Sequence, residues 1–236
     1  MILNKIESYI LKKIGPKHNW GQGHSNLFLP SDTYLDTEEF KYILWIDRAY
    51  SLVQNTPGHI VEIGVARGRN SILFGHLIKM HGDLSVRKYF GFDTFEGYES
   101  KDLKNNPHLS ANAFKETSLN FVSNRLAKTG LADICSLVKG DISETAPKFL
   151  KEVKGERFQI GHFQAAMLYI DCNAYEPALE AMETFKPFMA PGGVICIDEK
   201  MQGGETKALT EFCMKYGLDY RKDAGPFSIP AYTRLK

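Results

Sequence analysis

From residue 59 onward, short apolar runs alternate with amphipathic stretches along the chain. Each run is about five residues long, which is short for a helix and typical of a strand buried on both faces. A stretch with helical spacing or a long polar stretch follows each run. This alternation predicts repeated strand–helix units that form a mostly parallel sheet. The five runs are HIVEIGV, KYFGFD, ICSLVKGD, AAMLYID and GGVICID.

The last part of the chain breaks this alternation. The stretches GLDYRKDAG and FSIPAYTRLK follow one another with no helical pattern between them. They predict two strands that pair as an antiparallel hairpin at the edge of the sheet. We therefore expect an α/β, doubly wound fold of Rossmann-like type that is closed by this hairpin.

The first 56 residues lack the strand pattern. Residues 2–14 carry Ile and Leu at helical spacing and predict a helix that packs on the domain or on a second copy of the chain in a homodimer. A peripheral membrane anchor is the alternative for this helix. Residues 15–36 are rich in Gly, Pro, Asn and Ser and predict a loop, and a second helix is expected to begin at Thr37. We interpret residues 1–56 as a helical lid and residues 57–236 as the ligand-binding part of a single domain.

The composition, 43% hydrophobic and 24% charged residues, is close to the average of globular proteins and excludes a disordered chain or a collagen. The 29 Lys and Arg residues balance 28 Asp and Glu residues, so we expect no nucleic-acid partner. No apolar run approaches the roughly 18 residues needed to span a bilayer. The N-terminus also lacks the continuous apolar segment of a secretory signal. We therefore expect a cytoplasmic protein without a membrane span.

The turn after the first predicted strand has the pattern E-x-G-x-x-x-G. Glu62 and Gly64 end the strand, and Gly68 precedes a helix whose first turn includes Ser71. A glycine allows a tight turn and the close approach of a ligand, and the N–H groups at a helix start attract an anion. The spacing differs from the G-x-G-x-x-G of dinucleotide binding and suits a carboxylate or amino-acid end better than a pyrophosphate. We predict a ligand-binding turn, with packing alone as the alternative role of the glycines.

Two further strand ends carry residues suited to a nucleoside. Asp93 ends the second predicted strand, where an acidic side chain can bind both hydroxyls of a ribose. Asp141 and Ile142 follow the third strand and would flank an adenine with one polar and one apolar contact. A solvated loop position is the alternative for Asp93.

Acidic residues also follow the fourth and fifth predicted strands. Asp171 ends the fourth strand, and Asp198 and Glu199 end the fifth. Because parallel strands end at the same edge of a sheet, these carboxylates are expected to converge beside the ligand. Like charges so close are unfavourable unless one is protonated or a cation binds, and Mg²⁺ with its preference for oxygen ligands would satisfy them. The alternative is that Asp171 only holds the cofactor, while the pair after the fifth strand interacts with Lys200 or with Arg side chains.

Four stretches resemble the motifs of one known family. EIGVARG, GFDTFEGY, IDCNAYEPAL and GGVICIDE are similar to motifs of the macrocin O-methyltransferase (TylF-like) family of class I S-adenosylmethionine methyltransferases. The resemblance implies a seven-stranded doubly wound fold, S-adenosylmethionine and Mg²⁺ as cofactors, and methylation of a hydroxyl, often on a sugar of a natural product. Carried over by motif, it assigns residues to the methionine end (Glu62, Gly64, Gly68), to the ribose (Asp93) and to the metal (Asp171, Asp198, Glu199).

The sequence departs from the family pattern after the fourth strand. The family commonly has a second acid where this chain has Asn173, and some members have His where this chain has Ala174. Both changes remove a candidate general base and leave Asp171, Asp198 or a residue of the lid for that role. In addition, the acid pair after the fifth strand is Asp-Glu rather than Asp-Asp.

Together, the residues and the resemblance predict a Mg²⁺-dependent O-methyltransferase that acts on a hydroxyl of a small molecule, with a sugar or a glycosylated metabolite as the favoured acceptor. Two alternatives stay open. A metal-independent N- or O-methyltransferase would keep its activity in a chelator. A non-catalytic, methyltransferase-like binding module would bind no S-adenosylmethionine.

Overall fold

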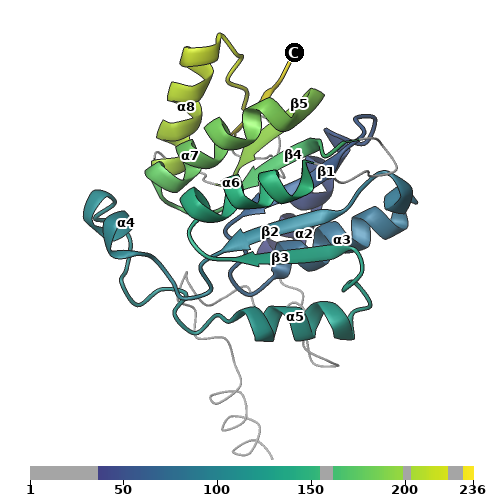
Figure 1. Ribbon diagram of the computed structural model, residues 1–236, viewed down its shortest axis with the longest axis horizontal. Coiled ribbons are helices and arrows are strands. Elements are labelled where there is room, and N and C mark those ends of the chain that lie inside the picture. Colours follow the sequence, from purple (N-terminus) through teal and green to yellow (C-terminus); the bar gives the residue numbers. More distant parts are fainter. Residues whose placement is uncertain (1–36, 155–161, 199–202, 223–230) are drawn as a thin grey trace, which may run out of the picture.

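The central element of the molecule is a β-sheet of six strands (Figure 1). The structure is a computed structural model that describes residues 37–154, 162–198, 203–222 and 231–236. The strands lie in the order β3-β2-β1-β4-β5-β6, and all neighbouring pairs are parallel except β5 and β6. The strands are β1 (His59–Ile63), β2 (Tyr89–Asp93), β3 (Cys135–Lys139), β4 (Ala165–Ile170), β5 (Met189–Ile197) and β6 (Ala231–Arg234).

Helices cover both faces of the sheet, which confirms the predicted doubly wound α/β fold. Helices α2, α3 and α5 pack on one face, and α6, α7 and α8 pack on the other (Figure 1). No described helix is both long enough and apolar enough to cross a membrane. The helices are α2 (Thr37–Ser51), α3 (Arg69–Met80), α4 (Ser100–Asn105), α5 (Leu119–Lys128), α6 (Ile142–Val153), α7 (Tyr175–Phe185) and α8 (Gly204–Tyr216), with the short 3-10 helices η2 (Asp83–Ser85) and η3 (Lys186–Phe188).

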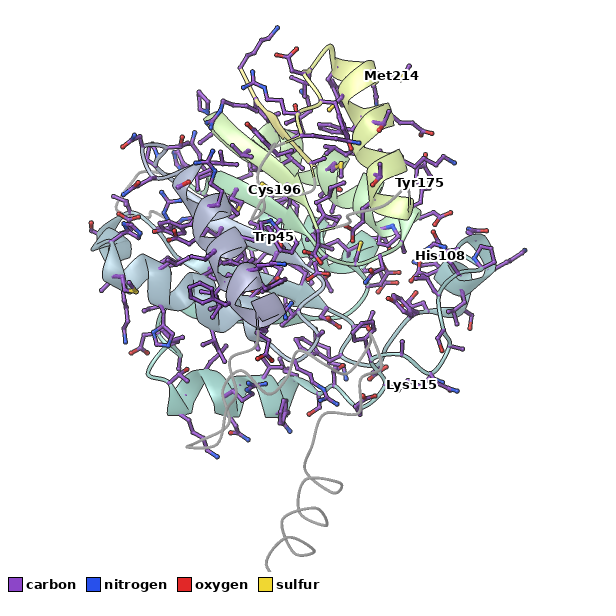
Figure 2. The ribbon with its side chains drawn as sticks, turned by 180° about the vertical axis from the view of Figure 1, so that it is seen from behind. Trp45, His108, Lys115, Tyr175, Cys196 and Met214 are labelled. Carbon is purple, nitrogen blue, oxygen red and sulfur yellow. The ribbon has the colours of Figure 1, made fainter. Side chains whose placement is uncertain are left out.

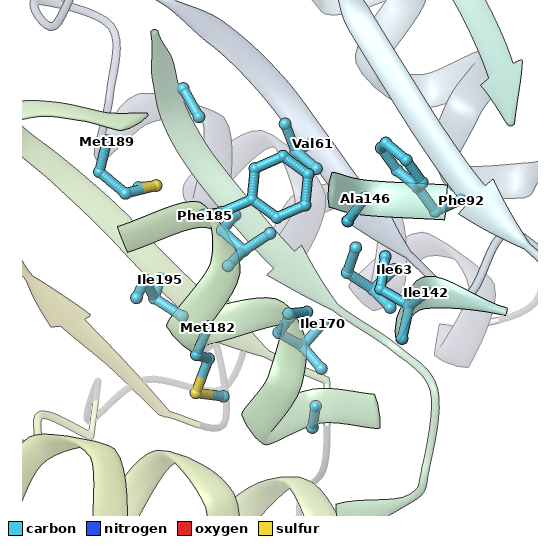
Figure 3. Packing of buried hydrophobic residues seen from close by; sticks show 14 of the residues in the cluster. Val61, Ile63, Phe92, Ile142, Ala146, Ile170, Met182, Phe185, Met189 and Ile195 are labelled. Carbon is cyan, nitrogen blue, oxygen red and sulfur yellow. The ribbon is translucent and has the colours of Figure 1, made fainter. Parts of the chain in front are cut away.

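Each strand divides its side chains between these two helical layers. Successive side chains of a strand point to opposite faces. Ile60 of β1 therefore packs with the layer of α2 and α3, whereas Val61 and Ile63 pack with the layer of α6 and α7. Figure 3 shows the second of these cores, where Phe185 of α7 lies against the sheet with its ring centroid 5.6 Å from that of Phe92. Burial on both faces explains why the strands are continuous apolar runs.

Helix α2 is part of the domain core. It crosses the sheet face that is seen in Figure 2 and carries the buried Trp45, whose ring centroid lies 6.4 Å from that of Tyr169 in β4. The second half of the predicted lid therefore packs on the sheet. The first helix and loop of that lid, residues 1–36, lie outside the described residues, so the division at residue 56 stays a prediction.

The predicted C-terminal hairpin is confirmed only in part. Strand β6 pairs antiparallel with β5. On its other side, Tyr232 and Arg221 exchange two backbone hydrogen bonds of 2.9 Å in a bridge of a single residue pair. One residue pair is too short to form a strand. The seventh strand implied by the family resemblance is therefore not confirmed in the described part of the chain.

Candidate active site

The carboxyl ends of β1, β4 and β5 meet at one edge of the sheet. The backbone hydrogen bonds continue past the strands, where the N–H of Asp171 donates to Ile63 at 2.8 Å and that of Asp198 to Ile170 at 2.9 Å. These bonds bring Asp171 and Asp198 to neighbouring positions beside Gly64, as the sequence predicts. Strands β1 and β4 are also the point where the strand order reverses, and ligands of doubly wound sheets bind at this point.

Two glycines shape the turn after β1. Gly64 has a φ of +91° and Gly68 a φ of +78°, values that favour glycine. A Cβ atom on Gly64 would overlap the backbone of Asp171, and one on Gly68 would lie 2.5 Å from Cγ1 of Val122 in α5. Both glycines therefore allow close packing around the turn, and their contact with a ligand stays a prediction.

Asn70 in the first turn of α3 connects three parts of the site. Its buried amide donates from Nδ2 to Oε1 of Glu62 at 2.7 Å and to Oδ2 of Asp171 at 3.1 Å. Its Oδ1 accepts a hydrogen bond of 2.5 Å from the hydroxyl of Tyr42 in α2. One side chain thus joins two carboxylates and ties α2 to the strand ends.

Glu62 is fully buried on the sheet face that α2 and α3 cover. The hydroxyl of Tyr89 donates to Oε2 of Glu62 and lies 2.8 Å from the hydroxyl of Ser71. Burial raises the pKa of Glu62 to about 8, although the hydrogen bonds from Tyr89 and Asn70 oppose the rise. The side chains of Glu62 and Ser71 therefore face other protein groups, and direct contact of either with a cofactor stays a prediction.

Asp171 and Asp198 lie in a region of concentrated negative charge. Burial raises the pKa of Asp171 well above its usual range, and the carboxylates of Asp198 and Glu205 add to the rise, whereas Arg69 opposes it. Oδ1 of Asp198 accepts a hydrogen bond of 3.1 Å from the hydroxyl of Tyr169. A cation bound near both aspartates would relieve the repulsion between them.

Glu205, a buried residue in the first turn of α8, holds the loop after β4 against the end of β5. Its Oε1 accepts from the N–H of Asn173 at 2.6 Å, and its Oε2 accepts from the N–H of Asp198 at 3.2 Å. Asn173 has a φ of +58°, a left-handed conformation that Asn tolerates better than most residues. The residue at the position of the family's second acid is therefore a backbone anchor in this chain.

Asp93 fixes the conformation of the glycine turn. Its Oδ2 accepts from the N–H groups of Val65 and Ala66, both at 2.8 Å, and its Oδ1 accepts from the N–H of Phe95 at 2.6 Å. An ionised carboxylate has about four acceptor positions, so one remains for a further donor. Its predicted contact with a ribose stays a prediction.

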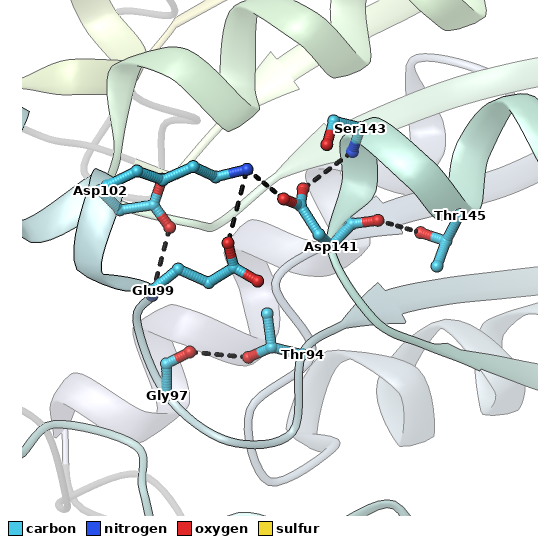
Figure 4. A network of polar contacts seen from close by, with 8 residues as sticks. Thr94, Gly97, Glu99, Asp102, Asp141, Ser143 and Thr145 are labelled. Carbon is cyan, nitrogen blue, oxygen red and sulfur yellow. Dashed lines mark hydrogen bonds and ion pairs between the residues drawn. The ribbon is translucent and has the colours of Figure 1, made fainter.

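Asp141 and Ile142 lie at the start of α6. Asp141 caps this helix by accepting from the N–H of Ser143 at 2.9 Å, and it also pairs with Lys101 of α4 (Figure 4). Lys101 in turn lies 3.4 Å from a carboxylate oxygen of Glu99, and this contact ties the segment after β2 to α6. The side chain of Ile142 is buried in the core between the sheet and α6. The adenine contacts of the two residues stay predictions.

Two of the three predicted metal ligands, Asp171 and Asp198, lie in the described part of the chain. The described residues contain no group of three or more His, Cys, Asp and Glu side chains that could hold a metal ion. The third predicted ligand, Glu199, lies outside the described residues. Mg²⁺ commonly takes one or two protein carboxylates and completes its shell with water and substrate oxygens. The carboxylates of Asp171 and Asp198 fit such a partial ligand set, and the site of three acids stays a prediction.

Several residues of the site are absent from the sequence-based prediction. Tyr89 and Tyr169 are hydroxyl-bearing positions in apolar strands, and this pattern could have identified them. Glu205 follows a Gly-Gly pair soon after the fifth strand, where a helix start was expected. Tyr42 and Arg69 had no local signal, because the contact between their helices joins segments that are far apart in the sequence.

Comparisons with known proteins identify the family of the chain. A family model described as a methyltransferase domain matches residues 61–199. The 8-demethyl-8-(2,3-dimethoxy-alpha-L-rhamnosyl)-tetracenomycin-C 4'-O-methyltransferase of Streptomyces olivaceus is 25% identical over 177 residues, which cover 71% of this chain and 62% of that protein. The chain thus spans about three fifths of the length of this relative.

Solved structures share the fold. The crystal structure of CalS11, a calicheamicin methyltransferase, superposes with a TM-score of 0.70 and 24% identity, covering 85% of this chain and 80% of that one. The O-methyltransferase NovP gives a TM-score of 0.64 and 20% identity, with 83% and 80% covered. At these identities the two superpositions establish the architecture.

Proposed function

The chain belongs to the methyltransferase-domain family, and from this premise we propose that it transfers the methyl group of S-adenosylmethionine to a hydroxyl of a sugar-bearing small molecule. One observation carries the proposal. The glycine turn after β1 and the aspartates after β4 and β5 meet at a single edge of the sheet, inside the region that the family model matches.

The acceptor class rests on the curated relative. The name of that enzyme describes methylation of the 4'-oxygen of a rhamnosyl-bearing tetracenomycin. The structural relative CalS11 is described as a TDP-rhamnose 3'-O-methyltransferase, which again is a sugar hydroxyl. We therefore propose a sugar hydroxyl as the acceptor, either on a nucleotide-linked sugar or on a finished glycoside.

The work of the chain in this reaction is positioning and proton removal. The donor already carries an activated methyl group, so the acceptor oxygen must be held in line with it while its proton leaves. The proton of the acceptor hydroxyl passes to the carboxylate of Asp171 or Asp198, the oxygen forms a bond to the methyl carbon, and the bond from that carbon to sulfur breaks. Asn70 fixes the orientation of Asp171, and Tyr169 fixes that of Asp198.

Mg²⁺ is part of the proposal. Asp171 and Asp198 would hold it together with Glu199, and when bound it would lower the pKa of an acceptor hydroxyl as it does for bound water. The Glu205 carboxylate accepts hydrogen bonds from the backbone N–H groups of Asn173 and Asp198, and it thereby supports the two loops that carry the aspartates. The two loops are thereby held in place independently of a metal.

The direct test measures binding and turnover separately. Isothermal titration calorimetry with S-adenosylhomocysteine, with and without Mg²⁺, tests whether the chain binds the cofactor product. Incubation with S-adenosylmethionine and two acceptor classes, a nucleotide-linked deoxysugar and a rhamnosyl glycoside, should give a mass increase of one methyl group in one of them. Absence of S-adenosylhomocysteine binding would refute the proposal, and turnover that survives a chelator would remove Mg²⁺ from it.

A further inference from the structure

Arg69, the first residue of α3, lies over an aromatic ring at the edge of the site. Its guanidinium carbon lies 3.2 Å from the ring centroid of Tyr42. Tyr42 is itself fixed, because its hydroxyl donates to Asn70 at 2.5 Å and its ring packs edge-on against Trp45 at 4.9 Å. The position of the guanidinium is therefore set by the protein before any ligand arrives.

One nitrogen of this group lacks an acceptor. Nη1 of Arg69 is buried and has no hydrogen-bond partner in the described part of the chain. A buried donor without a partner costs free energy, and such a group calls for a ligand that accepts its hydrogen bond. Nη1 itself is closed to solvent, although the residue as a whole is only partly buried, so a ligand would reach this nitrogen only after a local shift. The planar fork of Arg matches a carboxylate or a phosphate.

The surroundings of Arg69 are acidic. Asp171 is influenced by the charges of Asp198, Glu205 and Glu62, and Arg69 is the cation that opposes them. A ligand carboxylate that entered this region would be repelled by the carboxylates of Asp198 and Glu205 unless a cation received it. The methyl donor brings such a carboxylate at the end of its amino-acid part.

We propose that Arg69 binds the α-carboxylate of the methyl donor, an inference that rests on the proposed function. Other residues of the same turn are less suited to this contact. The side chain of Ser71 is fully buried against Tyr89, and Glu62 carries a carboxyl group of its own. Arg69 keeps both a positive charge and an unused donor at this point.

A ligand truncation combined with substitutions tests the assignment. Calorimetry would compare S-adenosylhomocysteine with 5'-deoxy-5'-methylthioadenosine, which lacks the amino-acid part, on the wild type, Arg69→Gln and Arg69→Lys. The matched control is Arg221→Gln, because Arg221 lies outside the glycine turn and pairs with Asp219 at 3.3 Å on the surface.

The expected result is selective. Arg69→Gln should weaken S-adenosylhomocysteine binding about tenfold or more and leave methylthioadenosine binding within twofold. Arg69→Lys should lose less affinity, and Arg221→Gln should match the wild type. Equal losses for both ligands, or no loss for either, would overturn the assignment. A rise in the acceptor KM with unchanged S-adenosylhomocysteine affinity would also overturn it, since Arg69 would then serve the acceptor.

If Arg69→Gln does not fold, the selectivity is read from Arg69→Lys alone. Failure of the wild type to bind S-adenosylhomocysteine would instead refute the proposed function.

Discussion

Gly64 lies against Asp171 so closely that a Cβ atom on Gly64 would be 2.0 Å from the carbonyl oxygen of Asp171. The contact joins the loop after β1 to the loop after β4, which starts with the candidate catalytic residue Asp171. The absence of a side chain at residue 64 is therefore a condition for the two halves of the sheet to meet at the site.

The first prediction follows from this contact. Gly64→Ala should lower the free energy of unfolding by about 3 kcal/mol or more, because a left-handed conformation and a backbone clash are both imposed. Gly82→Ala is the matched control, since Gly82 has a φ of +73° but open space around it, and should cost about 1–2 kcal/mol. Urea unfolding followed by circular dichroism measures both, and equal losses would contradict the role of the Gly64 contact.

The second prediction concerns the buried Glu62. Burial raises its pKa from 4.5 to about 8, so the folded protein holds a proton that the unfolded chain releases. The contribution of this bound proton to the free energy of unfolding is complete below pH 4.5. It is lost as the pH rises toward 8, by up to roughly 1.4 kcal/mol per pH unit. Glu62→Gln cannot release this proton, and its free energy of unfolding should change less between pH 5.5 and pH 7.5 than that of the wild type. Unfolding curves of both proteins at the two pH values measure this difference. If the wild type and Glu62→Gln lose the same free energy of unfolding between these pH values, the interpretation is wrong.

The third prediction concerns proton removal and the metal. Asp198→Asn keeps the size of the side chain and an acceptor for Tyr169, but it removes the negative charge. We expect kcat to fall about 100-fold or more, while the Kd for S-adenosylhomocysteine stays within threefold. Asp219→Asn is the control, because Asp219 is an exposed acid paired with Arg221 at 3.3 Å.

The same assays should show that EDTA abolishes turnover of the wild type and that added Mg²⁺ restores it. Full activity in EDTA together with an active Asp198→Asn variant would favour the metal-independent alternative.

The fourth prediction separates two roles of Asp141. Asp141→Ala should destabilise the protein by about 1 kcal/mol, because α6 loses its N-cap, whereas Asp141→Asn keeps an acceptor for Ser143. Lys101→Ala should cost less than about 0.5 kcal/mol, since the lysine is half exposed and the pair is screened. Thermal unfolding measures these effects. Weaker S-adenosylhomocysteine binding by Asp141→Asn, at unchanged stability, would support the predicted adenine contact, and unchanged binding would count against it.

The meeting of Asp171 and Asp198 was predictable from the sequence. Each follows a short apolar run, and parallel strands with helical crossovers must end at the same edge of the sheet. The glycine turn was predictable for a similar reason, because Gly64 and Gly68 stand between a strand pattern and a helix pattern. These inferences use only the period of the apolar residues and the positions of breaks.

The supporting contacts were not predictable in this way. Tyr42 and Asn70 meet because α2 packs beside α3, and an amphipathic pattern does not identify the partner of a helix. Glu205, at the start of α8, accepts a hydrogen bond from the N–H of Asn173. The local sequence does not predict this contact, because an acidic residue in the first turn of a helix is already explained by its interaction with the helix dipole. The short bridge at Arg221 likewise depends on tertiary context, since its sequence has strand propensity without extended pairing.

The adjacency of β1 and β4 has a consequence for how the protein is made. When a ribosome has delivered only β1, β2 and β3, one side of β1 still exposes a row of unused backbone groups, and its proper neighbour is more than seventy residues from β2 along the chain. Until β4 emerges, this apolar edge is open to pairing with other nascent chains. The arrangement that assembles the reaction centre from distant strands therefore also leaves one edge of β1 without its partner until β4 has been synthesised.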